Sequence, residues 1–293
     1  MSTARFPRVA IFGVGLIGGS IGLELRAARL CDTVIGYDTD AANLAQAVEL
    51  GIIDDAAERP EDAVRDADLI LLATPPASIV DTALALAPFA KEGAIITDVG
   101  SVKTAIVERL THELAPRLRF VGAHPVAGTE KSGAAAAMRD LFRGRKCILT
   151  PIADTDPEAL QAVRALWSRI GATVVLLSPA VHDTVCAAIS HLPHVTAYAL
   201  TAAIADAADR LPDIYGLGAG GFVDTTRIAS SSPQMWRDIF LLNRDAVLDA
   251  VERMQTRLGE LHTLIERGDS AGLEAFFARM RDVRARVLKG QQA

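Results

Sequence analysis

The stretch RVAIFGVGLIG (Arg8–Gly18) decides the fold of this chain. A short apolar run, Arg8–Phe12, predicts a strand and is followed at once by the pattern G-x-G-x-x-G, whose glycines are Gly13, Gly15 and Gly18. Glycines at this spacing let backbone amides and the N-terminus of the following helix approach a pyrophosphate. The pattern predicts a dinucleotide site, and the alternative is a glycine-rich turn that binds no nucleotide. The residues expected to contact the cofactor are Gly13, Gly15, Leu16, Ile17 and Gly18.

An acidic residue stands where such a unit needs one. The second apolar run, Thr33–Tyr37, ends at Asp38, which lies 20 residues after Gly18. In a Rossmann unit, an acid about 20 residues beyond the last glycine holds the ribose hydroxyls. A carboxylate there would repel the additional phosphate of NADP, and no Lys or Arg is adjacent in the sequence. NAD is therefore the expected cofactor.

Two further strand ends carry hydroxyl groups. Thr74 follows the apolar run Leu69–Ala73, and Ser101 follows the run Ala94–Val99. Ligands of doubly wound sheets bind outside the carboxyl ends of the strands, so both residues are candidates to face the nicotinamide half of the cofactor. Their positions fit ordinary turn or helix-cap residues nearly as well.

The pattern of elements changes near residue 179. Before it, short β-branched runs alternate with helical stretches, which predicts a parallel sheet covered by helices. After it, apolar residues recur every three or four positions, as helices require. We therefore expect an α/β, doubly wound Rossmann domain over residues 1–178 and an all-α domain over residues 179–293. The expected strands beyond those already named are Arg119–Ala123, Lys146–Thr150 and Thr173–Leu177.

Composition excludes several classes of protein. The 293 residues contain 30 Lys and Arg against 36 Asp and Glu, a net charge of −6 that disfavours nucleic-acid binding. The three cysteines form no C-x-x-C pair, which argues against a disulfide framework or a structural zinc site and favours a reducing cytoplasm. The apolar run Val9–Leu23 contains five glycines and ends at Glu24, short of the ~20 residues of a membrane span.

Histidine and arginine residues supply candidate chemistry. His124 ends a strand and enters a loop of small residues, although a histidine at a strand end is often structural. His191 and His194 lie in S-H-L-P-H, one residue short of the spacing in zinc proteases, so we expect no metal there. Arg227 follows a glycine-rich turn and can offer a fork to a carboxylate, or instead pair with Asp224 on the same helix face.

Together these motifs resemble the prephenate/arogenate dehydrogenase family of tyrosine biosynthesis. The resemblance covers about residues 8–245. It rests on the order of five segments, namely GVGLIGGS, DVGSVK, HPVAGTEKSG, SHLPH and GFVDTTRIASSSPQMW.

The resemblance implies an oxidative decarboxylation with NAD as hydride acceptor. His124 would accept a hydrogen bond or proton from the substrate hydroxyl, and Ser101 would orient it and touch cofactor and substrate. His191 and Arg227 would hold substrate carboxylate and polar groups, and Glu130 would join a polar network over the pocket. The helical half would form a homodimer. Some relatives have a lysine where this chain has Val223, so any role of that lysine is absent or moved.

Two other functions remain open at this point. A β-hydroxyacid dehydrogenase shares the order of domains, but such enzymes rely on a lysine in the helical domain, and this chain has none between Lys146 and Lys289. A catalytically silent NAD-binding regulator would keep the glycines without needing His124, His191 and Arg227 together. The sequence does not discriminate prephenate from arogenate.

Overall fold

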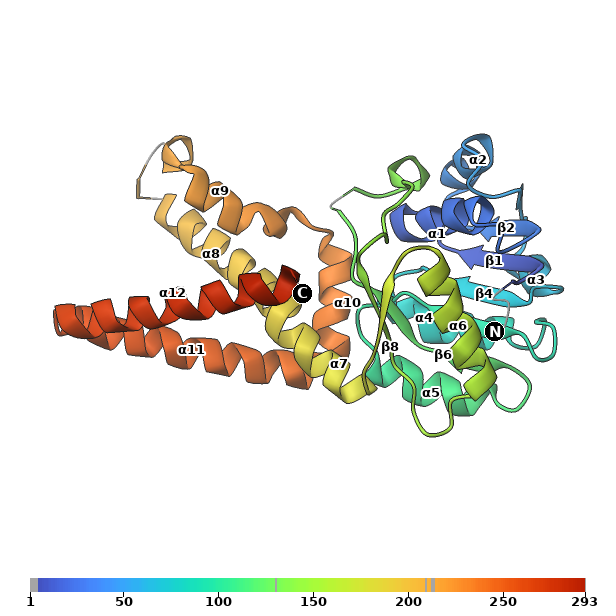
Figure 1. The fold of residues 1–293 in the computed structure, drawn as a ribbon. Helices are drawn as coiled ribbons and strands as arrows, with labels where there is room; N and C mark the ends of the chain where they lie inside the picture. Colours follow the sequence, from blue (N-terminus) through green and yellow to red (C-terminus); the bar gives the residue numbers. More distant parts are fainter. Residues whose placement is uncertain (1–4, 130, 209, 212–213, 293) are drawn as a thin grey trace. The chain divides into compact units, whose positions relative to one another are not determined.

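The computed structural model describes residues 5–129, 131–208, 210–211 and 214–292. Its N-terminal part is a six-stranded parallel sheet with the strand order β3-β2-β1-β4-β5-β6 (Figure 1). This order is that of a Rossmann fold, so the predicted fold class is confirmed. The strands are β1 (Arg8–Phe12), β2 (Thr33–Tyr37), β3 (Asp55–Ala56), β4 (Leu69–Leu72), β5 (Ile95–Asp98) and β6 (Arg119–Val121).

Helices cover both faces of this sheet. Along β1, Val9 and Ile11 enter one apolar cluster, and Ala10 and Phe12 enter another on the opposite face. A strand buried on both faces must be apolar at every position, which is why it reads as an unbroken apolar run. The helices of this part are α1 (Leu16–Ala27), α2 (Ala41–Glu49), α3 (Pro60–Val64), α4 (Ile79–Leu86) and α5 (Thr104–Leu114).

The predicted strand Arg119–Ala123 is divided in the structure. β6 ends at Val121, and β7 (Ala123–Pro125) begins a second sheet that also contains β8 (Lys146–Leu149) and β9 (Thr173–Leu176). Along the chain, α6 (Pro157–Arg169) lies between β8 and β9. Gly122 stands at the division, where an added Cβ would lie 2.6 Å from Thr150 Oγ1. The chain leaves the parallel sheet here, and His124 follows two residues after Gly122.

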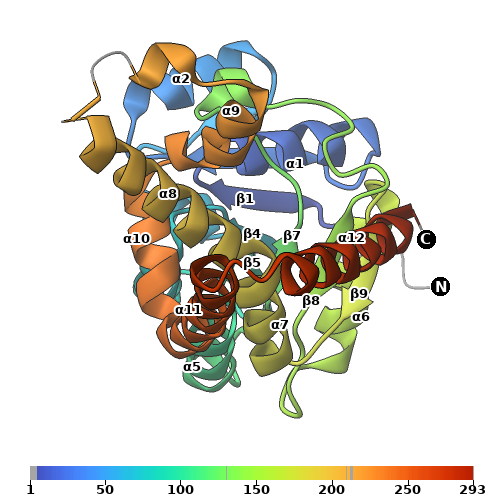
Figure 2. The same cartoon turned by 90° about the vertical axis from the view of Figure 1, so that its left-hand side faces the viewer.

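Helices follow the second sheet. α7 (Pro179–Cys186) lies beside α5 in both views (Figures 1 and 2) and continues through a π-helical turn, Ala187–His191, into α8 (Leu192–Ala208). The π turn precedes Pro193, which cannot donate a helical hydrogen bond. The remaining elements are α9 (Gly220–Thr226), a 3₁₀ turn (Arg227–Ser230), α10 (Pro233–Leu242), α11 (Arg244–Glu266) and α12 (Ser270–Gln292).

The chain forms two compact units. The first extends to Arg244 and includes the sheets and the helices through α10, and the second begins at Asp245 and contains α11 and α12. The last strand, β9, ends at Leu176, just before the predicted domain boundary at residue 179. The type of element changes there, and the domain boundary itself stays a prediction. Within the described ranges, no helix has the length and apolar character that a bilayer span requires.

Candidate active site

The glycine turn leaves room for a ligand beside the N-terminus of α1. Gly13 has φ +85°, and a Cβ there would lie 2.5 Å from the Ala73 carbonyl oxygen. A Cβ at Gly15 would meet only the Gly133 amide nitrogen, at 3.9 Å, among described residues. Gly15 also caps α1 without a side-chain hydrogen bond, so the first amides of the helix, including those of Leu16 and Ile17, are left for an anion. The geometry fits the predicted pyrophosphate site.

Asp38 lies directly beside this turn. Its Oδ2 accepts hydrogen bonds from Val14 N at 3.0 Å and Asn43 Nδ2 at 3.1 Å. Asn43 also donates to the Val14 carbonyl at 3.1 Å, and its Oδ1 accepts from Ala134 N at 2.6 Å. Asn43 thus connects the acid, the glycine turn and the loop after β7. Sequence reasoning missed Asn43 because nothing local distinguishes it from an ordinary helix residue.

Thr74 and Ser101 follow the neighbouring parallel strands β4 and β5, so both lie at the carboxyl edge of the sheet. Thr74 Oγ1 is buried and has no hydrogen-bond partner in the described part of the chain. Ser101 is half-buried, and a hydrogen bond to His124 is not among those that the described residues form. The roles of both hydroxyls stay predictions.

A buried ion pair fixes the loop that contains Ser101. The Lys103 ammonium pairs with Asp98, and both side chains are fully buried. Lys103 Nζ also donates to the Ala123 carbonyl at 2.9 Å, and Asp98 Oδ1 accepts from Ala123 N at 3.1 Å. Two charged groups therefore hold both polar atoms of the Ala123 backbone, which positions the next residue, His124.

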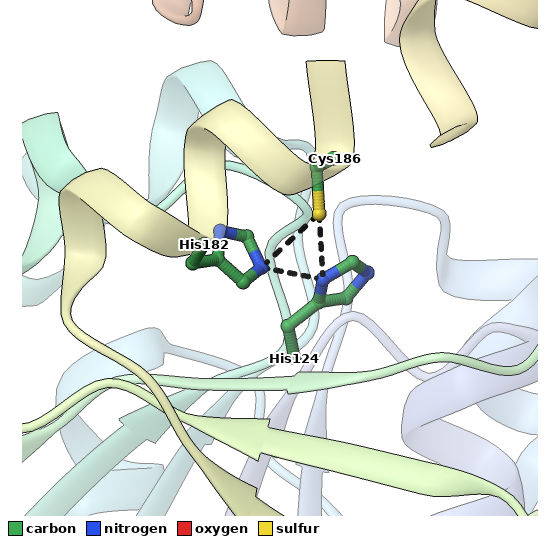
Figure 3. Close-up of side chains that lie close together, drawn as sticks. All are labelled: His124, His182 and Cys186. Atoms are coloured by element: carbon green, nitrogen blue, oxygen red, sulfur yellow. Dashed lines mark hydrogen bonds between the residues drawn. The ribbon is translucent and has the colours of Figure 1, made fainter. Parts of the chain in front are cut away.

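His124 is hydrogen-bonded to a second histidine from α7. Its Nδ1 lies 2.8 Å from His182 Nε2, and His182 Nδ1 lies 2.8 Å from Asp183 Oδ1. The Sγ of Cys186 is 3.5 Å from His182 Nε2 and 4.0 Å from His124 Nδ1. Figure 3 shows His182 and Cys186 converging on one edge of the His124 ring, while its other nitrogen points away from both. These three side chains lie close enough to hold a metal ion, but 2.8 Å between two ring nitrogens is a hydrogen-bond distance.

The surroundings keep His124 neutral. Burial is the main cause that lowers its pKa well below the usual value, and the nearby His182, Lys103 and His191 lower it further, whereas Asp183 opposes them. Burial raises the pKa of Asp183, but hydrogen bonds from His182 and from the backbone of Lys103 and Thr104 outweigh burial, so that the net pKa is lowered. His182 thus connects an ionised Asp183 to a neutral His124 through two hydrogen bonds.

His191 is fixed from the other side of Asp183. The side-chain nitrogen of Asn243 lies 3.2 Å from His191 Nδ1 and donates to the Asp183 carbonyl oxygen at 2.8 Å. His191 Nε2 is buried and has no partner among the described residues. Burial lowers the pKa of His191 to about 4. His194 turns elsewhere and stacks on Trp236, with ring centroids 3.5 Å apart.

Arg227 stands at the C-terminal end of α9, with an exposed side chain. The alternative ion pair with Asp224 is not among the salt bridges that the described residues form. Val223, one helical turn earlier, is 55% exposed. Glu130 lies outside the described residues. The structure thus brings His124, His182, Asp183 and His191 together, and leaves Arg227 without the competing ion pair.

A Rossmann sheet with an open glycine turn, and a neutral histidine held near its carboxyl edge, define the class of dinucleotide-dependent dehydrogenases. Family models described as "Prephenate dehydrogenase, nucleotide-binding domain" and "Prephenate dehydrogenase, dimerization domain" match residues 21–176 and 178–280. The chain belongs to the prephenate dehydrogenase family.

Named relatives cover most of the chain. The prephenate dehydrogenase of Bacillus subtilis is 38% identical over 94% of this chain and 75% of its own length. The cyclohexadienyl dehydrogenase of Zymomonas mobilis is 38% identical over 90% of both chains. Among solved structures, the Aquifex aeolicus prephenate dehydrogenase in complex with hydroxyphenyl propionate and NAD⁺ has a TM-score of 0.88, 38% identity and coverage of 96% of this chain and 98% of its own.

The comparison with β-hydroxyacid dehydrogenases is weaker. A 3-hydroxyisobutyrate dehydrogenase of Salmonella typhimurium has a TM-score of 0.58 and 18% identity, over 85% of this chain and 88% of its own. At that identity the likeness shows a shared fold alone.

Proposed function

We propose that this protein catalyses the NAD-dependent oxidative decarboxylation of prephenate to 4-hydroxyphenylpyruvate in tyrosine biosynthesis, in the cytoplasm. The observation that carries the proposal is the neutral, His182-bound His124 beside the carboxyl edge of a Rossmann sheet. Membership of the prephenate dehydrogenase family supports it. The three cysteines are free, which agrees with a reducing compartment.

The reaction asks little covalent chemistry of the protein. A bound NAD would supply the acceptor for the hydride of the ring carbon that bears the hydroxyl. The electrons of the bond to the ring carboxylate pass into the ring as carbon dioxide leaves, and the ring becomes aromatic. His124 accepts the hydroxyl proton as the hydride leaves the ring carbon, and it returns this proton to the product oxygen. Position, one neutral base and carboxylate binding are sufficient for this chemistry.

The residues around the glycine turn would hold the cofactor. The amides at the start of α1 would face the pyrophosphate beside Gly15, and Asp38 would face the ribose hydroxyls. Thr74 and Ser101, beyond β4 and β5, are the hydroxyl groups proposed for the nicotinamide half.

Cofactor preference gives a first prediction. Asp38→Ser removes the carboxylate that would repel the additional phosphate of NADP, so the KM for NADP should fall about tenfold or more, with kcat little changed. Steady-state rates with each cofactor measure this change. Asp40→Ser is the matched control, because Asp40 caps α2 through Ala42 and Asn43 and serine keeps that cap. Equal efficiency of the parent enzyme with both cofactors would contradict the role of Asp38.

Substrate carboxylates would be bound by Arg227 and by His191 Nε2, which has no partner among described residues. We expect Arg227→Ala to raise the KM for prephenate about tenfold or more and to leave the KM for NAD nearly unchanged. A charge-assisted hydrogen bond is typically worth about 1.5–3 kcal/mol. Arg109→Ala, which removes an exposed arginine paired with Glu113 on α5, is the control. An unchanged KM for prephenate in a folded Arg227→Ala protein would assign Arg227 a structural role.

The test of the function is formation of NADH from NAD and prephenate by the purified chain. Similar proteins are named for both possible substrates. Besides the prephenate dehydrogenases, the Synechocystis arogenate dehydrogenase has a TM-score of 0.81 and 33% identity over 96% of this chain. Parallel assays with prephenate and arogenate therefore decide the preference. Failure with both substrates would refute the proposed function.

We further propose a homodimer formed through α11 and α12. The groove between these helices is lined by five apolar side chains together with Arg257 and Arg279, and Leu258 and Met280 are 53% and 39% exposed in the single chain. A second copy would cover this apolar surface, in line with the family description of the domain.

Light scattering should therefore give twice the 31.0 kDa of one chain. Met280→Glu should shift the mass toward one chain, because a carboxylate would be buried in the interface. Val48→Glu, at an exposed apolar residue of α2, should not change the mass. A parent protein of 31.0 kDa at micromolar concentration would contradict the dimer.

A further inference from the structure

We propose that Asp183 fixes His124 and His191 in opposite tautomers, with His182 and Asn243 as the intermediate positioning residues. His124 is left with an unprotonated Nε2, and His191 with a protonated Nε2. The geometry of the hydrogen bonds carries this inference, and its consequence for catalysis rests on the proposed function.

The first chain of hydrogen bonds passes through the Asp183 side chain. An ionised carboxylate can only accept, so His182 Nδ1, at 2.8 Å, carries the proton. His182 Nε2 is therefore unprotonated when the ring is neutral, and His124 Nδ1, 2.8 Å away, must donate to it. With its proton on Nδ1, a neutral His124 has a free lone pair on Nε2, the nitrogen that points away from the cluster in Figure 3.

Backbone contacts hold this carboxylate in place. Asp183 Oδ1 also accepts from Lys103 N, and Oδ2 accepts from Thr104 N, both at 2.8 Å. These amides belong to the start of α5, where unpartnered N–H groups favour a negative charge. Asp183 therefore keeps its charge and its orientation. As a fixed acceptor, it decides which nitrogen donates in each hydrogen bond from His124 through His182.

The second chain passes through the Asp183 backbone. Its carbonyl oxygen can only accept, so the side-chain atom of Asn243 at 2.8 Å is the amide nitrogen. That nitrogen has a second hydrogen, and it lies 3.2 Å from His191 Nδ1. His191 Nδ1 therefore accepts, and the ring proton resides on Nε2, which is buried and has no partner among the described residues.

The two tautomers serve opposite requirements of one reaction. A base for the substrate hydroxyl needs a free lone pair, and a group that binds a carboxylate needs an N–H. Two neutral histidines can perform both tasks only if their protons are placed on different nitrogens. Asp183 achieves this placement by accepting through its side chain on one side and through its backbone on the other.

Imidazole nitrogen NMR tests the placement without any assay of activity. In protein labelled with ¹⁵N-histidine, long-range ¹H–¹⁵N spectra distinguish protonated from unprotonated ring nitrogens, and single His→Gln variants assign the signals. We expect a protonated Nδ1 for His124 and a protonated Nε2 for His191. A protonated Nε2 on His124 would overturn the proposal, as would a pattern that changes on treatment with EDTA, because a metal ion would then join His124, His182 and Cys186.

Kinetics of two variants test the consequence. His182→Phe removes the acceptor for His124 Nδ1 and should lower kcat about 10²-fold with the KM for prephenate nearly unchanged. Asn243→Asp puts an acceptor against His191 Nδ1, so it should move the His191 proton off Nε2 and raise the KM for prephenate about tenfold, with a smaller effect on kcat. If the two residues were merely structural, the His182 variant would not change mainly kcat while the Asn243 variant changes mainly KM.

Two controls separate these effects from misfolding. Val185→Ala changes an exposed residue of the same helix, α7, and should keep kcat within about twofold of the parent enzyme. Asn243→Ala removes the donor without adding a charge, so it replaces Asn243→Asp if the charged variant does not fold. Equal losses of kcat in the His182 and Asn243 variants, with unchanged NMR spectra, would refute the tautomer assignment while leaving the proposed function intact.

Discussion

His124→Ala should lower kcat about 10²- to 10⁴-fold while the affinity for NAD stays nearly the same, because general-base assistance of this kind is usually worth that range. The variant removes the only described histidine whose Nδ1 bonds to His182. The measurements are kcat from NADH formation and the dissociation constant of NAD from fluorescence or calorimetry. His112→Ala, at an exposed position of α5, is the matched control.

The pH profile distinguishes His124 from other bases. Only the neutral ring can accept the substrate proton, so kcat should fall as the pH drops through the pKa of His124. That pKa is lowered by burial and by His182, Lys103 and His191, against Asp183, so the neutral form persists below the usual pH range of histidine. The acidic limb should disappear in His124→Ala. A variant with normal kcat and the same limb would assign the proton to His191 instead.

Lys103→Met should lower the free energy of unfolding by about 3–5 kcal/mol, because it leaves the Asp98 carboxylate buried without its cation. The loss should reach the active site as well, since Lys103 Nζ and Asp98 together hold the Ala123 backbone next to His124. Urea unfolding at fixed protein concentration measures the first effect, and kcat of the folded fraction measures the second.

Two comparisons make this result specific to the buried pair. Lys91→Met breaks a salt bridge with Asp68 in which the lysine is 52% exposed, so it should cost less than about 1 kcal/mol. Adding Asp98→Asn to Lys103→Met removes the unpaired charge and should restore much of the lost stability. A Lys103→Met protein as stable as the parent would show that the backbone donors to Asp98 are sufficient.

Much of the fold follows from local sequence. The glycine spacing and the acid after the second strand predict the Rossmann unit, and β1 and β2 have the predicted bounds. Apolar runs buried on both faces are long enough to be read without tertiary information. The two-residue strand β3 has no such signal, and the division at Gly122 depends on close contacts with Thr150 and Val107, which are distant in sequence.

The predicted site residues are the ones with distinctive motifs, and the residues that position them are not distinctive. His124 and His191 stand out in their segments. Asp183 reaches Lys103 across 80 residues, and Asn243 reaches Asp183 across 60. A pairing over such distances exists only after the sheet and α7 have formed, so no local pattern predicts it. The adjacent titratable residues His182 and Asp183 are the local signal that could have drawn attention to this segment.

The π-helical turn Ala187–His191 gives the chain a place where its length can change without loss of this site. A π turn holds one residue more than an α-helical turn over a similar rise. Removing one residue there, for example the exposed Ala188, would let the turn close to α-helical pitch while α8 keeps its phase relative to α7. His182 and Asp183 would stay beside His124, and His191 would stay beside Asn243. The same deletion in the regular part of a helix would instead rotate every later residue of that helix by about 100°.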